Sequence, residues 1–252
     1  MGLACPPVTP EPQTAWGGGF PSTHWTVVLA AGSSESAAGF AALAEVCGAY
    51  WHPLYAFTRK LGYEPADAQD LVQGFFASLL ERPFLDRADA EKGRFRSFLL
   101  GAFKKHLGKE RERAGAQKRS GAHPHLSLDV ENLEARLAPE LATRQNPESL
   151  FERAWAVAIL DEAMRRLENE CERSGRLALF KQVQPCLEGD PDAARYAEIA
   201  ARLGTTANTI GVTVSRMRRR YLGLLRAVIL QTVGSPEEVE EELRHLLRVL
   251  RG

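Results

Sequence analysis

The stretch YAEIAARLGTTANTIGVTVSRMRRRY, residues 196 to 221, is the most informative part of this chain. Apolar residues between positions 197 and 203 recur at helical spacing and predict a short helix with one apolar face. Gly204 then supplies the left-handed conformation that a tight turn between two crossing helices requires. Thr206 can cap a second helix. The residues expected to anchor that second helix in a core are Ile210, Val214 and Met217.

This helical pair is open to two interpretations, a DNA-binding helix-turn-helix or two packed helices of a bundle. Four arginines crowd the far part of the second helix with no acidic residue within a turn: Arg216, Arg218, Arg219 and Arg220. A helix face that is merely solvated usually mixes both charge signs. Unpaired cations beside a helix in the major groove suit phosphate contact and counterion release. We therefore expect this segment to bind DNA.

The outward residues of the second helix are expected to divide between bases and phosphates. Next to the cap Thr206, the residues that can face base edges are Asn208, Thr209, Val212 and Ser215. Arg216 can reach a guanine, because its planar fork matches two acceptors there. Arg219 and Arg220 are expected to hold phosphates, which orient a protein without reading sequence.

The remainder of the chain predicts helices and shows no convincing strand alternation. Apolar spacing predicts a helix over residues 36–60, interrupted or kinked at Pro53, and a second from Pro65 to about Arg82. A third helix follows Gly93. Asn146 and Pro147 are typical of a helix start, and Ser235 with Glu238 has the spacing of a capping box.

Composition divides the chain into segments around these helices. Residues 1–21 are rich in proline and contain the run Gly17–Gly19, which predicts a disordered extension. Residues 22–114 form a first helical domain and residues 146–233 a second one with the helix-turn-helix. Residues 115–145, with Gly, Ser, His and Pro, are expected to be a flexible linker. Residues 234–252 predict an amphipathic C-terminal helix. The expected fold is all-α, with two small helical domains.

The formal net charge is zero, but the charges are unevenly distributed along the chain. Residues 92–119 contain ten Lys and Arg against two Glu, and residues 195–226 contain seven Arg against one Glu. Residues 61–91 contain seven Asp and Glu against two Arg. Two basic blocks and one acidic block predict at least two kinds of partner.

Several classes of protein are disfavoured by the sequence. Cysteines 5, 47, 171 and 186 have no CxxC spacing, so neither a zinc site nor a disulfide framework is expected, and His123 and His125 are expected to lie in a polar loop. No P-loop, nucleophile elbow or HExxH motif is present, so we expect neither an enzyme nor a cofactor. No apolar run reaches membrane-spanning length, and we expect a cytoplasmic protein without a membrane partner.

Two strings in this chain resemble bacterial RNA polymerase sigma factors of the extracytoplasmic-function type. DAQDLVQGFF, residues 67–76, is similar to the conserved-region-two signature of that family. YAEIAARLG, residues 196–204, is similar to the start of its region-four helix-turn-helix. The resemblance covers roughly residues 36–225, and the expected linker lies where the family has one.

The resemblance implies a protein that binds core RNA polymerase and directs promoter recognition and transcription initiation, without catalysis. The residues implied to bind polymerase are Asp67, Asp70 and Gln73. Those implied to receive the minus-ten element and hold the melted strand are Arg94, Arg96, Lys104, Lys105, Lys109 and Arg113. The second domain, with the residues named above from Thr206 to Arg220, would read the minus-thirty-five element. Promoter DNA and core polymerase are the implied partners, and an anti-sigma factor or other regulator is a candidate.

Alternatives remain open at several of these positions. Asp67 and Asp70 could instead favour the helix N-terminus through the helix dipole. Phenylalanines 95, 98 and 103 could stack on bases, although their helical spacing indicates core positions first. The C-terminal helix could dock on its own chain or recruit a regulator. The alternative function is a stand-alone helix-turn-helix regulator that binds duplex operator DNA.

Overall fold

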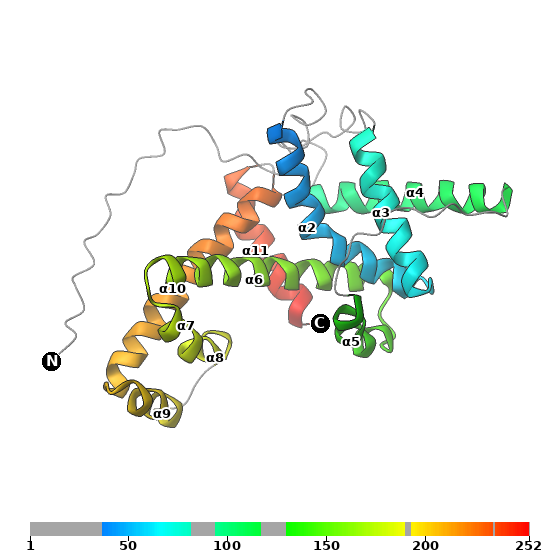
Figure 1. The fold of residues 1–252 in the computed structure, drawn as a ribbon. Helices are drawn as coiled ribbons and strands as arrows, with labels where there is room; N and C mark the ends of the chain where they lie inside the picture. Colours follow the sequence, from blue (N-terminus) through cyan, green and yellow to red (C-terminus); the bar gives the residue numbers. More distant parts are fainter. Residues whose placement is uncertain (1–36, 82–93, 117–129, 190–192, 234, 252) are drawn as a thin grey trace.

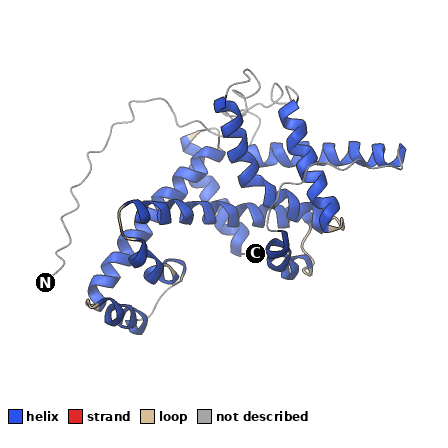
Figure 2. Cartoon of the chain, viewed as in Figure 1, coloured by secondary structure: helices blue, strands red, loops and turns tan. Residues whose placement is uncertain are grey.

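The computed structural model describes residues 37–81, 94–116, 130–189, 193–233 and 235–251, and every regular element in these ranges is a helix (Figures 1 and 2). The helices are α2 (Ala37–Lys60), α3 (Pro65–Glu81), α4 (Phe95–Ala116), α5 (Val130–Leu141), α6 (Pro147–Arg173), α7 (Leu177–Val183), α8 (Pro185–Glu188), α9 (Ala193–Leu203), α10 (Ala207–Thr232), the 3-10 turn η3 (Pro236–Glu238) and α11 (Val239–Arg251). The all-α prediction is confirmed for this part of the chain. The expected disordered extension and the loop with His123 and His125 lie outside the described residues.

The long helix α6 organises the fold (Figure 1). Asn146 caps its start: the backbone N–H of Ser149 donates to Asn146 Oδ1 at 2.7 Å, and Pro147 occupies the first turn. Both features follow the sequence prediction, because each depends only on neighbouring residues. The apolar stripe of α6 is long enough to contribute to two cores, one at each end of the helix.

The larger core joins α2, α3 and α4 to the first half of α6 and to the end of α10 and α11. Trp155 of α6 is 1% exposed within it, together with Tyr50 and Phe57 of α2. Phe95 and Phe103 of α4 are also buried in this core, as their spacing predicts, and Phe98 is partly buried against it. The core therefore contains residues from both of the domains expected from the sequence.

The smaller core lies under the helix-turn-helix. It packs the second half of α6 against α7, α8, α9 and the first half of α10. Ile210, Val214 and Met217 are buried here, as expected. Since α6 and α10 each contribute to both cores, these two helices hold the ends of the molecule together.

The division into two domains with a flexible linker is not confirmed. Within the expected linker, residues 130–141 form helix α5, which packs on α2. Leu133, Leu137 and Leu141 recur every four residues and all contact the larger core. Glu134 of α5 also accepts hydrogen bonds from Arg59 and Tyr55 of α2. The acidic and proline-containing composition of this segment concealed a short amphipathic helix.

Two local predictions about helix interruption and capping differ from the structure. Helix α2 is not interrupted at Pro53, which is buried inside it. A proline inside a helix costs about 3 kcal/mol, and the packing of α2 on α6 offsets this loss. Ser235 precedes η3, but its side chain makes no capping hydrogen bond, so the expected capping box does not form.

Helix α11 returns to the body of the molecule and packs on α6 and α10. Val239 and Leu246 are buried, and Leu243, Val249 and Leu250 are partly buried against the larger core. The structure thus shows α11 docked on its own chain. Among the described helices, none combines the length and apolarity needed to span a membrane.

Candidate nucleic-acid interface

Helices α9 and α10 form the tight pair that the sequence predicts. Gly204 adopts a φ of +63° between them, and the backbone N–H of Thr205 donates to the carbonyl of Ala200 at 3.0 Å. Thr206 caps α10: its hydroxyl oxygen accepts from the backbone N–H of Thr209 at 3.2 Å. Ala200 and Ile210 are both buried where the helices meet. The structure therefore has two helices joined by a short turn with a left-handed glycine, as expected for a helix-turn-helix.

The face of α10 opposite the smaller core is exposed. All eight residues of the predicted base-reading and phosphate-binding set are exposed: Thr206, Asn208, Thr209, Val212, Ser215, Arg216, Arg219 and Arg220. Positions 208, 212, 215 and 219 follow the helical repeat, so they form one stripe along the helix. Val212 is 43% exposed on this stripe. This surface is the candidate interface for duplex DNA.

The arginines at the far end of the stripe have different partners. Arg218 turns inward and donates to the backbone carbonyls of Cys186, at 2.7 Å, and Gly189. Arg220 pairs with Glu170 of α6 at 2.6 Å, and its hydrogen bonds hold the pKa of Glu170 below its usual value. Arg216 and Arg219 are exposed and form no ion pair with any residue that the structure describes.

Arg220 was expected to hold a phosphate, and the structure shows it paired with Glu170 while its side chain stays 58% exposed. The two residues are separated by 50 positions and meet because α6 packs on α10. Part of the positive charge at this end of α10 is therefore balanced within the protein.

The second basic block lies along α4, whose C-terminal end projects beyond the other helices (Figure 1). Lys105 and Lys109 are exposed on it. Lys104 pairs with Glu148 at 2.6 Å, and Arg113 pairs with Glu110 one turn earlier. These four residues remain accessible, although two of them already have an acidic neighbour.

The start of α4 differs from the sequence expectation. Arg96 was expected to face the minus-ten element, but it is 3% exposed and covered by α11. Its Nε donates to Glu152 at 2.8 Å, its Nη1 pairs with Glu242, and its guanidinium lies 4.4 Å from the ring centre of Trp155. Burial lowers the pKa of Arg96. In this conformation Arg96 cannot contact DNA.

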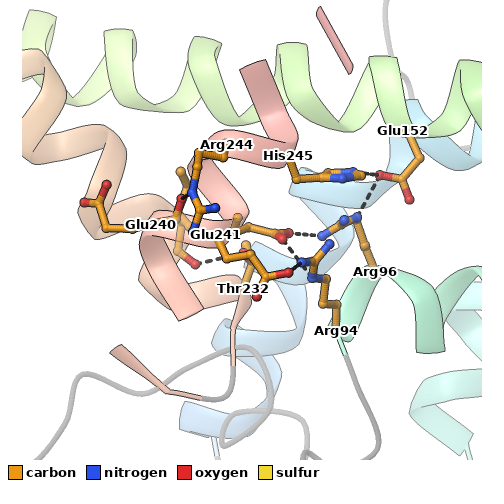
Figure 3. Close-up of polar contacts among 10 residues, drawn as sticks. Arg94, Arg96, Glu152, Thr232, Glu240, Glu241, Arg244 and His245 are labelled. Carbon is orange, nitrogen blue, oxygen red and sulfur yellow. Dashed lines mark hydrogen bonds and ion pairs between the residues drawn. The ribbon is translucent and has the colours of Figure 1, made fainter. Parts of the chain in front are cut away.

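Arg94 lies beside Arg96 and is also held by α11 (Figure 3). Its Nη2 donates to Glu241 at 2.6 Å, and its Nε lies 3.0 Å from a carboxylate oxygen of Glu242. His245 of α11 completes the group by lying 2.9 Å from the Glu152 carboxylate. The network thus connects α4, α6 and α11 (Figure 3).

Four residues of this network were not predicted from the sequence as partners of α4: Glu152, Glu241, Glu242 and His245. The burial of Glu242 could have been predicted from its position, which is three residues after Val239 and four before Leu246. A carboxylate at that spacing lies on the apolar stripe of the helix, and a buried carboxylate requires a cationic partner. Nothing in the sequence indicates which arginine that partner is, because Arg96 is 146 positions away.

The residues expected to contact polymerase lie on α3. Asp67 and Asp70 are exposed near the start of the helix. Gln73 is half-buried, and its Nε2 is buried without a hydrogen-bond partner among the described residues. The two aspartates therefore present an acidic surface, whereas Gln73 is only partly accessible for the expected contact.

No cluster of three or more His, Cys, Asp and Glu side chains that could hold a metal ion occurs among the residues with a described position. Cys171 and Cys186 are buried free thiols. Comparison of the chain with protein-family models, curated proteins and solved structures finds no match in any of the three.

Proposed function

We propose that this protein is a sigma factor that binds core RNA polymerase and directs promoter recognition. The observation that carries the proposal is the exposed stripe on α10, which follows a Gly204 turn and ends in the exposed Arg216 and Arg219. An exposed helix face with base-reading polar residues and unpaired cations fits a major groove. The second support is the resemblance of residues 67–76 and 196–204 to sigma-factor motifs.

The stripe on α10 predicts a division of labour in DNA binding. Arg219→Ala should weaken binding to all duplex sequences and lower the salt slope of the affinity by about 1, because it removes one phosphate contact. Asn208→Ala or Ser215→Ala should instead change the preferred sequence, with a cost of about 1–3 kcal/mol on the best site. Binding to a randomised duplex library at several salt concentrations measures both effects. An equal loss on every sequence for all three variants would contradict this division.

The acidic surface of α3 is the proposed polymerase contact. The test is comigration of the purified protein with core RNA polymerase on size exclusion, with Asp70→Arg as the disrupting variant. Glu172→Arg, at an exposed position near the end of α6, makes the same charge reversal away from α3 and serves as the matched control. Comigration that Asp70→Arg abolishes and Glu172→Arg preserves supports the proposal. Absence of comigration for the unmodified protein, with duplex DNA binding intact, rejects it.

One observation favours a second candidate, a stand-alone helix-turn-helix regulator of duplex DNA. Arg96 is buried and Arg94 is paired, so two of the residues proposed for the minus-ten element are occupied by the protein itself. A regulator that binds only through α10 would have no need of them. Duplex binding without any affinity for polymerase would select this candidate.

A further inference from the structure

Two arginines at the start of α4, Arg94 just before the helix and Arg96 in its first turn, are paired with carboxylates of α11. Glu242 is 1% exposed and contacts both Arg94 and Arg96. Glu241 lies beside it and accepts from Arg94. The two carboxylates come from the first turn of α11, whereas every other basic residue proposed for the minus-ten element remains exposed on α4. Helix α11 therefore covers one end of an otherwise accessible basic surface.

A carboxylate and a phosphate make the same kind of contact with an arginine. Each presents two acceptor oxygens that match the planar fork of a guanidinium. Glu241 and Glu242 are consecutive and bind Arg94, which immediately precedes α4, and Arg96 in its first turn, which also pairs with Glu152 of α6. The carboxylates thus hold the positions that backbone phosphates of a nucleic acid strand would hold on the same two arginines.

The ionic contacts do not by themselves fix α11 in place. Desolvation of buried charges offsets most of the attraction within an ion pair, so such a pair contributes little net stability. The exposed side of the network, between Arg94 and Glu241, is open to solvent and is screened by salt. Apart from these ion pairs, α11 is held by the buried Val239 and Leu246 and by the partly buried Leu243, Val249 and Leu250. A ligand that supplies its own negative charges competes with the carboxylates of α11 for the two arginines, although not with these apolar contacts.

We infer that α11 is a displaceable cover of a single-strand binding site, and that its Glu241 and Glu242 compete with nucleic acid phosphates for Arg94 and Arg96. The inference rests on the proposed function, because that function assigns the melted strand to α4. It goes further by naming the residues that close the site and the chemistry that opens it. Nucleic acid binding at α4 and docking of α11 exclude each other.

The test measures binding of a single-stranded DNA oligonucleotide to the full chain with both carboxylates neutralised. Glu241→Gln with Glu242→Gln keeps the side-chain shapes but removes the competing charges. We expect the affinity to rise about tenfold at 0.1 M salt, because the strand no longer has to displace two competing carboxylates from Arg94 and Arg96. The matched control is Glu172→Gln with Glu237→Gln, which changes the net charge equally at exposed positions away from Arg94 and Arg96.

A third variant tests whether Arg94 makes the additional contact with the oligonucleotide. Arg94→Gln added to the Glu241→Gln, Glu242→Gln pair should remove about half of the gain in binding free energy. Hydrogen exchange gives an independent readout on the unmodified protein: saturating oligonucleotide should speed exchange of the backbone amides of residues 239–251. A merely structural α11 would show no such response.

The outcomes separate this inference from the proposed function. If the neutralised variant binds the oligonucleotide no better than its charge-matched control, α11 does not cover the site, and sequence-specific duplex binding by α10 would leave the proposed function standing. If the chain binds neither single strands nor duplex DNA, both are overturned. A gain in affinity that depends on Arg94 supports the inference.

Discussion

Gly204 adopts a backbone conformation that other residues avoid. Its φ of +63° carries a cost of roughly 1–2 kcal/mol for a residue with a Cβ, and no neighbouring atom lies within 4 Å of the point that a Cβ would occupy. Gly204→Ala should therefore destabilise the protein by about 1 kcal/mol, as measured by urea unfolding. Gly223→Ala is the matched control: that site is helical and open, so alanine should stabilise by about 0.5–1 kcal/mol. Equal effects of both substitutions would contradict this account.

His52 is a half-buried base that resists protonation. Burial, with a contribution from the nearby Arg136 charge, lowers its pKa from 6.5 to about 4. Above pH 6.5 the ring is neutral in the folded and unfolded states, whereas below it the unfolded chain takes up the proton first. Stability should fall as the pH drops from 6.5 towards 4, and this residue should contribute a loss of about 2 kcal/mol at pH 5.

Urea unfolding at pH 7 and pH 5 measures this loss, and His52→Gln should reduce it. The variant removes the titrating group at the same half-buried position on α2. Identical pH dependence in the variant and the unmodified chain would show that other groups cause the loss.

Individual residues were predictable where their role is local. The turn at Gly204 and the caps at Asn146 and Thr206 depend on neighbours within four positions, and the structure has all three. Arg96 was misplaced because its carboxylate partners are 56 and 146 positions away. Charge in a sequence does not reveal whether a helix from elsewhere in the chain will neutralise it.

Helix starts provide a comparison between a cap that forms and one that does not. Asn146 accepts a hydrogen bond from the first turn of α6, whereas the Ser235 side chain makes none before η3. Asn146→Ala should destabilise the protein by about 1 kcal/mol, and Ser235→Ala should change its stability by less than about 0.5 kcal/mol. Thermal unfolding of the two variants measures the difference. A larger loss for Ser235→Ala would show that its cap forms in solution.

Helices were predictable from the sequence where the apolar stripe extends over several turns. Helices α2, α3, α4, α6 and α10 each have an apolar stripe of several turns, which the spacing rules detect. Helix α5 has only three turns and contains Pro139, so composition suggested a loop. Its stability comes from packing on α2 and from the Arg59–Glu134 pair, which are tertiary contacts that no local rule includes.

At the scale of the whole molecule, the helices are more closely integrated than the sequence suggests. The sequence predicted two separate helical units, yet α6 and α10 contribute to both cores. The candidate duplex-binding surface on α10 and the projecting C-terminal end of α4 lie at opposite ends of the molecule (Figure 1). An apolar stripe identifies the buried face of a helix, but it does not say which other helix will cover it.

Because α11 is docked on the larger core, a substitution in α11 should change both the overall stability and the hydrogen exchange of the distant helix α4. Leu246 is fully buried in the larger core, so Leu246→Ala should cost about 2–5 kcal/mol and should speed hydrogen exchange at the start of α4. Its neighbour Leu247 is 45% exposed, and Leu247→Ala should change stability by less than about 0.5 kcal/mol. Equal, small effects of the two substitutions would indicate that α11 is not docked in solution.

The separation of Arg96 from Glu242 also sets an order of events during synthesis. The ribosome must add 146 residues after Arg96 before Glu242 exists, which takes roughly 7–30 seconds at ordinary elongation rates. Glu152 of α6, the other partner of Arg96, is made after only 56 residues, so α6 can pair with Arg96 well before α11 exists. Arg94 gains its carboxylate partners Glu241 and Glu242 only when α11 has been made, so the charge of this site is balanced last.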